Sequence, residues 1–223
     1  MDILLLGIGT IITLIAQLYV TSSYNKYNKY KTKNGITGFE VARKILDSHG
    51  LNSVYIVETK GMLSDHYDPS AKVVRLSSNV FHGNSIASCS VAAHEVGHAI
   101  QDQENYSFMK IRGALFPIVN FSSYAGYFAI IIGAVFKFWD LIWLGIALEL
   151  IILLFQLVTL PVEFNASNRA MQELQKNNIL ATQELKHSKT MLTAAALTYV
   201  ASVINTIFQI LRLILIYGGK RND

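Results

Sequence analysis

One stretch of the chain combines residues suited to metal binding and proton transfer: His94-Glu95-Val96-Gly97-His98. On an α-helix, four residues make just over one turn, so both imidazoles project from one side and can bind the same metal ion. Glu95 then lies beside the metal, where it can take a proton from a metal-bound water. Because zinc acidifies such a water and polarises a carbonyl group, the pattern predicts zinc-dependent hydrolysis of peptide bonds with Glu95 as general base.

This short pattern can also arise by chance, and it carries chemistry only on a helix. Asn84-Ser85 predicts a helix start, and the helix is expected to continue to about Gln103. Glycine inside a helix costs roughly 1 kcal/mol relative to alanine, so Gly97 indicates that another element comes close there. A buried apolar stripe is expected along this helix at Ile86, Cys89, Ala93, Val96 and Ile100.

Two histidines do not complete a catalytic zinc site, which takes three protein ligands and leaves the fourth position to water. No third histidine follows at a short spacing. Glu163 is the best candidate, because it comes just after Pro161 and begins a helical run that extends to Ala170. A carboxylate there could equally be a solvated charge, which the start of a helix favours. Position and residue type leave both roles open.

Hydrophobic residues make up 52% and charged residues 15% of the 223 residues, and the mean hydropathy is +0.34. This apolar excess predicts a membrane protein whose partner is the lipid bilayer. Four stretches approach or exceed the roughly 20 residues that cross a bilayer: residues 3–20, 114–136, 141–160 and 191–217. The first lacks a basic start and a cleavage pattern, so we expect a retained anchor and a multi-pass protein of the cell membrane.

Lysines directly after the first span predict that this side of the membrane is cytoplasmic. The cluster contains Lys26, Lys29, Lys31 and Lys33, interleaved with Tyr24, Tyr27 and Tyr30, which are expected at headgroup level. Nucleic-acid binding is the competing use of such a patch, but nothing else in the sequence supports a nucleic-acid partner. Residues 21–113 and 161–190 are expected on one side, because two spans separate them. Lys220-Arg221 would then lie outside, against the charge rule.

The expected fold class is a mainly α membrane protein with about four transmembrane helices and a small α+β domain. A capping-box pattern at Thr37 and Glu40 predicts a helix that ends at Gly50. β-Branched runs at residues 54–57 and 73–76 predict two strands. In chain order we expect a transmembrane anchor at 1–20, the α+β domain at 21–113, a transmembrane hairpin at 114–160, a helix with the third-ligand candidate at 161–190, a transmembrane helix at 191–217 and a tail at 218–223.

Four segments carry a family resemblance: Thr37-Gly-Phe-Glu-Val-Ala, Leu63-Ser-Asp-His-Tyr-Asp-Pro69, Val74-Arg-Leu-Ser77 and the residues around His94. From about Thr37 to the last span, the chain resembles the YugP-type neutral zinc metallopeptidases of bacterial membranes. It is more distantly similar to the HtpX and CAAX-prenyl protease group of gluzincins. In gluzincins the third ligand is a glutamate on a later helix, in a Glu-x-x-Ala-Asp arrangement. Glu163-Phe-Asn-Ala166 looks like that arrangement, with Ser167 in place of the aspartate.

The resemblance implies a zincin-like domain, one zinc ion held by His94, His98 and Glu163, and peptidase activity at a membrane, and it leaves the physiological substrate open. Together with the charge pattern, the leading hypothesis is a cytoplasmic zinc domain that acts as an endopeptidase on membrane proteins or peptides. The aspartate that is missing here would normally orient a zinc histidine, and Asp102 or Asn165 could replace it. The sequence gives no indication of an oligomeric state.

The segment around His66 allows two interpretations. The His66 imidazole or the Tyr67 phenol could donate a hydrogen bond to an oxyanion, and the strand at residues 73–76 could pair with an extended peptide. Alternatively, the segment is a structural turn in which Asp65 and Asp68 bond their own backbone, and this interpretation is the simpler one.

Three other classes of protein are alternatives to this peptidase. The main alternative is a non-catalytic zinc-stabilised membrane scaffold or chaperone, in which Glu95 has no chemical role. An intramembrane protease is disfavoured because the helix that carries His94 is too polar for a span. Glu149 and Arg212 lie within predicted spans and could form a structural pair between helices. A secondary transporter would show repeat symmetry among the spans, which the sequence lacks.

Overall fold

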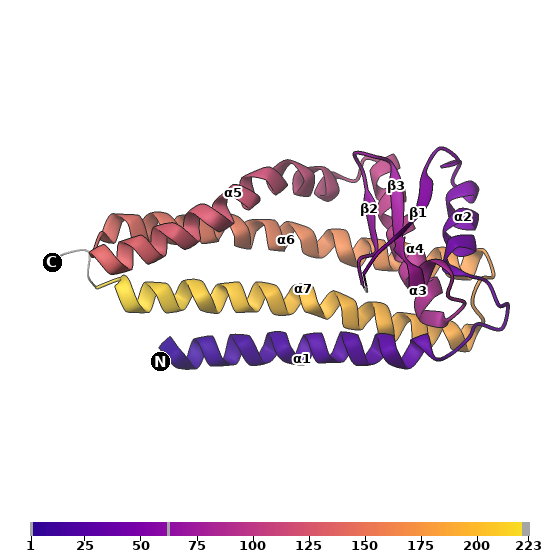
Figure 1. The fold of residues 1–223 in the computed structure, drawn as a ribbon, viewed down its shortest axis with the longest axis horizontal. Helices are drawn as coiled ribbons and strands as arrows, with labels where there is room; N and C mark the ends of the chain where they lie inside the picture. Colours follow the sequence, from indigo (N-terminus) through magenta and orange to yellow (C-terminus); the bar gives the residue numbers. More distant parts are fainter. Residues whose placement is uncertain (1, 62, 220–223) are drawn as a thin grey trace. The chain divides into compact units, whose positions relative to one another are not determined.

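The computed structural model describes residues 2–61 and 63–219, which form mainly helices and one small sheet (Figure 1). The helices are α1 (Asp2–Asn28), α2 (Gly38–Ser48), α3 (Ser78–Phe81), α4 (Ile86–Gln103), α5 (Ser107–Phe136), α6 (Trp139–Lys176) and α7 (Thr182–Tyr217). The strands are β1 (Tyr55–Thr59), β2 (His66–Asp68) and β3 (Val73–Ser77). Two compact units result: the apolar unit, formed by the described residues of Met1–Gln17, Lys110–Pro161 and Leu197–Asp223, and the site unit, formed by those of Leu18–Met109 and Val162–Ala196.

Four helices are long and apolar enough to cross a membrane by length and composition: α1, α5, α6 and α7. This confirms the predicted mainly helical fold with four membrane-length segments. Each of these helices is longer than the apolar stretch that predicted it. In particular, α6 is 38 residues long and runs without a break through Pro161, so Glu163 lies in the continuation of a membrane-length helix.

Glycines bring α5 and α6 into close contact within the apolar unit. A Cβ atom at Gly145 would lie 2.5 Å from Cγ1 of Ile130, and one at Gly133 would lie 2.6 Å from Cγ1 of Ile142. Lipid provides no hydrophobic drive for helices to associate, so close van der Waals packing at small residues stabilises such pairs. These two helices therefore form a tightly packed hairpin.

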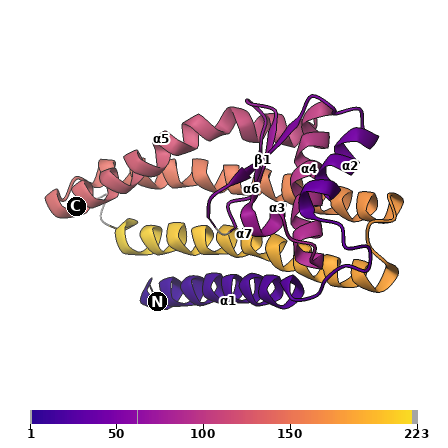
Figure 2. The ribbon, with the colours of Figure 1, turned by 45° about the vertical axis from the view of Figure 1, so that its right-hand side comes forward.

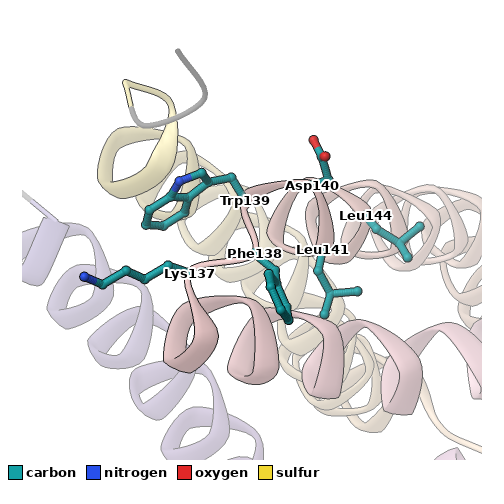
Figure 3. A pocket seen from close by; sticks show the side chains of 6 residues that line it. All are labelled: Lys137, Phe138, Trp139, Asp140, Leu141 and Leu144. Atoms are coloured by element: carbon teal, nitrogen blue, oxygen red, sulfur yellow. The ribbon is translucent and has the colours of Figure 1, made fainter. Parts of the chain in front are cut away.

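The turn of this hairpin mixes aromatic and charged residues. Lys137 forms the turn with a φ of 58°, in the left-handed region. A shallow hollow at this end is lined by Lys137, Phe138, Trp139, Asp140, Leu141 and Leu144 (Figure 3). The side chains of Lys137 and Asp140 point away from each other (Figure 3). This composition is typical of a segment at a membrane–water interface.

The predicted pairing of Glu149 with Arg212 is wrong, because these two side chains form no ion pair among the residues that the structure describes. The rings of Trp139, at the start of α6, and Tyr217, at the end of α7, lie 6.3 Å apart. Arg212 is near the Tyr217 end of α7, whereas Glu149 is about three turns into α6. At a rise of 1.5 Å per residue, their depths differ by about 7 Å, which explains the missing contact.

The sheet of the site unit has the strand order β1-β3-β2, with β1 parallel and β2 antiparallel to β3. Two of these strands confirm the predicted β-branched runs. The third, β2, was predicted as a turn, and its three residues are held in register by β3, with Tyr67 opposite Val74. Because β3 lies between the other two strands, the prediction that residues 73–76 pair with a peptide is wrong. The free edge on this side of the sheet is β2.

The two helices that were predicted in this unit begin where their caps indicated. The Thr37 side chain accepts a hydrogen bond from the Glu40 backbone and the Glu40 side chain accepts one from Thr37, which completes the capping box of α2. The Ser85 side chain caps α4 by accepting from the Ser88 backbone. In Figures 1 and 2, α2 lies beside α4, and the apolar face of α2 packs in the same core as the predicted stripe of α4. Burial raises the pKa of Cys89 in this stripe to about 12, so the thiol is inert.

The charge pattern predicted that the tyrosines after the first span lie at headgroup level, but two of the three are buried inside the protein. Tyr24 and Tyr27 are buried in the core of the site unit, and only Tyr30 is largely exposed. The helix α1 continues to Asn28, so its last turns present one face to this core. Tyr27 also stacks on the ring of His187, with centroids 5.1 Å apart. The last turns of α1 are therefore part of the site unit.

Candidate metal centre

Two helices of the site unit supply the three candidate ligands. His94 and His98 lie on α4, and Glu163 lies on the part of α6 that belongs to this unit. The helices touch at Gly97, where an added Cβ atom would lie only 2.7 Å from the carbonyl oxygen of Ala166. Glycine is therefore required by the close approach of another helix, as its position in the sequence indicated. This contact brings the Glu163 carboxylate to the histidine face of α4.

The donor atoms of the three residues converge on one point. Oε2 of Glu163 lies 3.3 Å from Nε2 of His94 and 3.6 Å from Nε2 of His98. One donor atom from each of the three residues can be chosen so that all lie within 4.8 Å of one another. Zinc binds nitrogen and oxygen tetrahedrally at about 2.0–2.1 Å, so its ligand atoms lie about 3.4 Å apart. The observed spacing therefore fits a zinc ion with little rearrangement.

The carboxylate at the centre of this group is buried and charged. Glu163 is 2% exposed. Burial by itself raises the pKa of Glu163, but hydrogen bonds from His94 and His98 outweigh it and hold the pKa well below its usual range. A buried carboxylate needs such compensation from positive charge or strong donors. A divalent cation would supply the same compensation, which makes this donor set suitable for a metal.

Gln101 orients His98. Its Oε1 atom lies 3.0 Å from Nδ1 of His98, and its Nε2 atom donates to the carbonyl oxygen of Val162 and to Oδ1 of Asn165. This arrangement leaves Nε2 of His98 directed at Glu163. Asp102 was suggested for this role, but its carboxylate instead accepts a hydrogen bond from the Tyr67 hydroxyl. Asn165, the other suggested residue, does not contact His98 in this network. Its side chain accepts a hydrogen bond from Gln101 and so helps to hold Gln101 in place.

His94 has a different and weaker support. Oγ of Ser167 lies 3.3 Å from Nδ1 of His94. Ser167 stands where the resemblance implies an aspartate, so a neutral hydroxyl lies beside His94 in place of a charged group. A neutral hydroxyl fixes a ring less strongly than a carboxylate does.

Glu95 lies beside the two histidines on α4 and is held by β2 rather than by α6. Its Oε2 atom accepts a hydrogen bond of 3.0 Å from the backbone N–H of Tyr67 in β2. Burial raises the pKa of Glu95 to about 7, with repulsion from Glu163 and Asp65 adding to the effect and His94 opposing it. A carboxyl group whose pKa lies near neutrality can accept a proton and release it again, which a general base requires.

The segment from Asp65 to Asp68, which includes β2, is held by several hydrogen bonds within the protein. Nδ1 of His66 bonds the carbonyl oxygen of Ser64 on the exposed side of the strand. Asp68 accepts from the backbone of the turn that follows it, as predicted, whereas Asp65 accepts from the backbone and hydroxyl of Ser77 in β3. The Tyr67 hydroxyl donates to Asp102 at 2.7 Å. The Tyr67 hydroxyl is therefore engaged with Asp102, and the His66 ring is held through its Nδ1 atom.

Sequence reasoning missed Gln101 and the backbone N–H of Tyr67. Gln101 could have been found, because a residue three positions after His98 lies on the same helical face. A backbone group has no signature of its own in a sequence. Its role is seen only once β2 is placed against α4.

Comparisons with known proteins point to a zinc-dependent peptidase family. The family described as "Putative neutral zinc metallopeptidase" matches residues 2–218. A Bacillus subtilis (strain 168) protein named "Putative membrane protease YugP" is 44% identical over 208 residues, which cover 93% of this chain and 92% of that protein. No solved structure matches the chain.

Proposed function

This chain belongs to the neutral zinc metallopeptidase family, and from that premise we propose that it is a membrane-embedded zinc-dependent endopeptidase of the gluzincin type. The observation that carries the proposal is the convergence of His94, His98 and Glu163 at spacings that fit tetrahedral zinc. The zincin-like unit that holds them combines a small sheet with the helix of the two histidines.

His94, His98 and Glu163 would hold one zinc ion through Nε2, Nε2 and a carboxylate oxygen. When bound, the ion polarises the scissile carbonyl and acidifies the attacking water. Glu95 takes the proton of that water and later delivers it to the leaving amine. The N–H of Tyr67 keeps the Glu95 carboxylate in place during both transfers.

The open edge of β2 offers a place for the substrate backbone. Only one side of β2 pairs within the sheet, so an extended peptide can add to its other side. On that open side Tyr67 already uses its N–H for Glu95, which places the edge next to the general base. A peptide aligned there would pass close to both the base and the candidate zinc ligands.

We place this unit on the cytoplasmic side of the membrane. The lysines that follow the first membrane-length stretch support this orientation, because cytoplasmic segments carry an excess of basic residues. Substrates would be membrane proteins or peptides cut near the bilayer, where a shared membrane raises the encounter rate. No nucleic-acid partner is part of the proposal.

Replacing Glu95 tests the proposal. The Glu95→Gln protein should bind as much zinc as the wild type in detergent, yet lose at least about 100-fold in casein hydrolysis, since general-base catalysis contributes about 10²–10⁴-fold. Glu58→Gln, the same change at an exposed glutamate of β1, is the matched control and should keep full activity. A wild type that binds zinc but hydrolyses nothing would favour the scaffold or chaperone alternative instead.

A further inference from the structure

Tyr67 bridges two points of α4 that are about two helical turns apart. Its backbone N–H donates to Glu95 at 3.0 Å, and its hydroxyl donates to Asp102 at 2.7 Å. Positions separated by seven residues lie on one face of a helix, roughly 10.5 Å apart along its axis. The side chain of Tyr67 therefore extends along α4, on the face to which His98 also belongs.

Asp102 holds β2 at a second place. Lys72, in the turn between β2 and β3, forms an ion pair with the same carboxylate oxygen that accepts from Tyr67. Tyr67 is buried, and both its burial and the neighbouring Asp102 raise its pKa, so the phenol stays protonated and remains a donor. The turn and the strand are thus both fastened to the last turns of α4.

This fastening matters because β2 has little other support. The strand contains only three residues and pairs with β3 on one side alone. Short edge strands with few backbone bonds open easily. The Tyr67 N–H that holds Glu95 is part of this strand, so any movement of β2 away from α4 displaces the carboxylate.

We propose that Tyr67 and Asp102 are positioning residues, whose side-chain hydrogen bond keeps β2 against α4 and thereby keeps the Tyr67 N–H on Glu95. The inference rests on the proposed function, because it gives the bond a role in catalysis through the general base. It adds a side-chain tether that differs from the candidate metal ligands and from the backbone edge of β2 that would pair with the substrate.

The test compares Tyr67→Phe, Asp102→Ala and the double variant with the wild type. Each variant should retain its zinc and lose about tenfold in kcat per bound zinc, the lower end of the range for groups that orient an active-site residue. The KM should change by less than about twofold, because neither substitution removes a backbone group of β2 with which a peptide could pair. Tyr67→Phe removes the bond between Tyr67 and Asp102, and Asp102→Ala removes that bond together with the Lys72 ion pair. The double variant should therefore be no slower than Asp102→Ala alone.

Hydrogen–deuterium exchange of residues 64–72 supplies a measurement that does not depend on activity. Exchange should be at least about fivefold faster in both variants, because loss of the tether exposes the amides of β2. Tyr55→Phe is the matched control, since Tyr55 lies on β1 and is 71% exposed, and it should change neither kcat nor exchange.

The outcomes separate the two proposals. A lower melting temperature with unchanged kcat per bound zinc would assign the bond a purely structural role and overturn the inference. Unchanged exchange in residues 64–72 would overturn it as well. If the wild type shows no zinc-dependent hydrolysis, the proposed function fails, and the exchange experiment alone then decides whether the tether exists.

Discussion

The two flanks of α4 are built for different tasks. On the flank that faces α6, polar side chains contact the ring nitrogens of the two histidines. Glu163 contacts both rings, and each ring has one further partner, Gln101 for His98 and Ser167 for His94. On the β2 flank, polar groups converge on carboxylates: the Tyr67 backbone on Glu95 and its hydroxyl on Asp102. One helix thus presents candidate metal ligands to one neighbour and the candidate base to another.

This division implies that metal binding and proton transfer can be damaged separately. The α6 flank is fixed by direct helix contact at Gly97 and by a side-chain network, so it should tolerate little change. The β2 flank depends on a three-residue strand. Substitutions on the α6 flank should therefore change zinc affinity, whereas those on the β2 flank should change the rate at full zinc occupancy.

The largest effect is expected for Glu163→Gln. An amide supplies a neutral, weaker oxygen ligand in place of a buried carboxylate, so zinc affinity should fall by more than about 100-fold, beyond the loss typical of supporting residues. Hydrolysis should disappear with the zinc. Metal analysis after dialysis against a weak chelator measures this, with Glu58→Gln as control. Retention of one zinc per chain in Glu163→Gln would show that the third ligand lies elsewhere.

Gln101→Leu should have the next largest effect. The substitution removes the acceptor for His98 and leaves that ring free to rotate, which should lower zinc affinity about 10–100-fold. Activity should return when zinc is added in excess, because Glu95 and β2 are untouched. Gln175→Leu, at an exposed position of α6, is the matched control and should bind zinc like the wild type. A loss of kcat that excess zinc does not restore would break the proposed division between the flanks.

Gly97→Ala tests the helix contact itself. The added Cβ atom would lie 2.7 Å from the carbonyl oxygen of Ala166, a backbone atom that moves only with its helix. Such overpacking typically costs about 1–3 kcal/mol, and thermal unfolding should show it as a lower melting temperature. Gly113→Ala provides the control, because a Cβ there would meet nothing within 4 Å in helix α5. Equal melting temperatures for Gly97→Ala and the wild type would mean that the helices separate without cost.

The sequence predicted those parts of the site unit that depend on local spacing. The capping box at Thr37, the start of α4 at Ser85 and the shared face of His94 and His98 each follow from residues within one or two helical turns. The close approach at Gly97 was also predicted, because a mid-helix glycine needs a reason that a neighbouring backbone supplies.

The parts that sequence reasoning left open or got wrong depend on contacts between distant residues. Residue type left Glu163 between two roles, since 69 positions separate it from His94. The strand β2 has the sequence His-Tyr-Asp, which lacks β-branched residues, and it forms because β3 and Glu95 bond its backbone. Tyr24 was expected at headgroup level but lies in the core. Its amphipathic ring suits an interface or a core equally well, so residue type could not decide between them.

The smallest effect is expected at Ser167, the weaker of the two supports on the α6 flank. Ser167→Ala should lower zinc affinity by less than about tenfold, below the loss for Gln101→Leu, because the contact with His94 is a long, neutral hydrogen bond of 3.3 Å. Ser167→Asp should raise the affinity, since a carboxylate binds the ring N–H more strongly and increases the basicity of the ligating nitrogen. Competition with a chromogenic zinc chelator measures both changes. If Ser167→Asp instead weakened zinc binding, a second carboxylate beside His94 and Glu163 would be unfavourable. The neutral serine would then suit this site better than the aspartate that the resemblance implies.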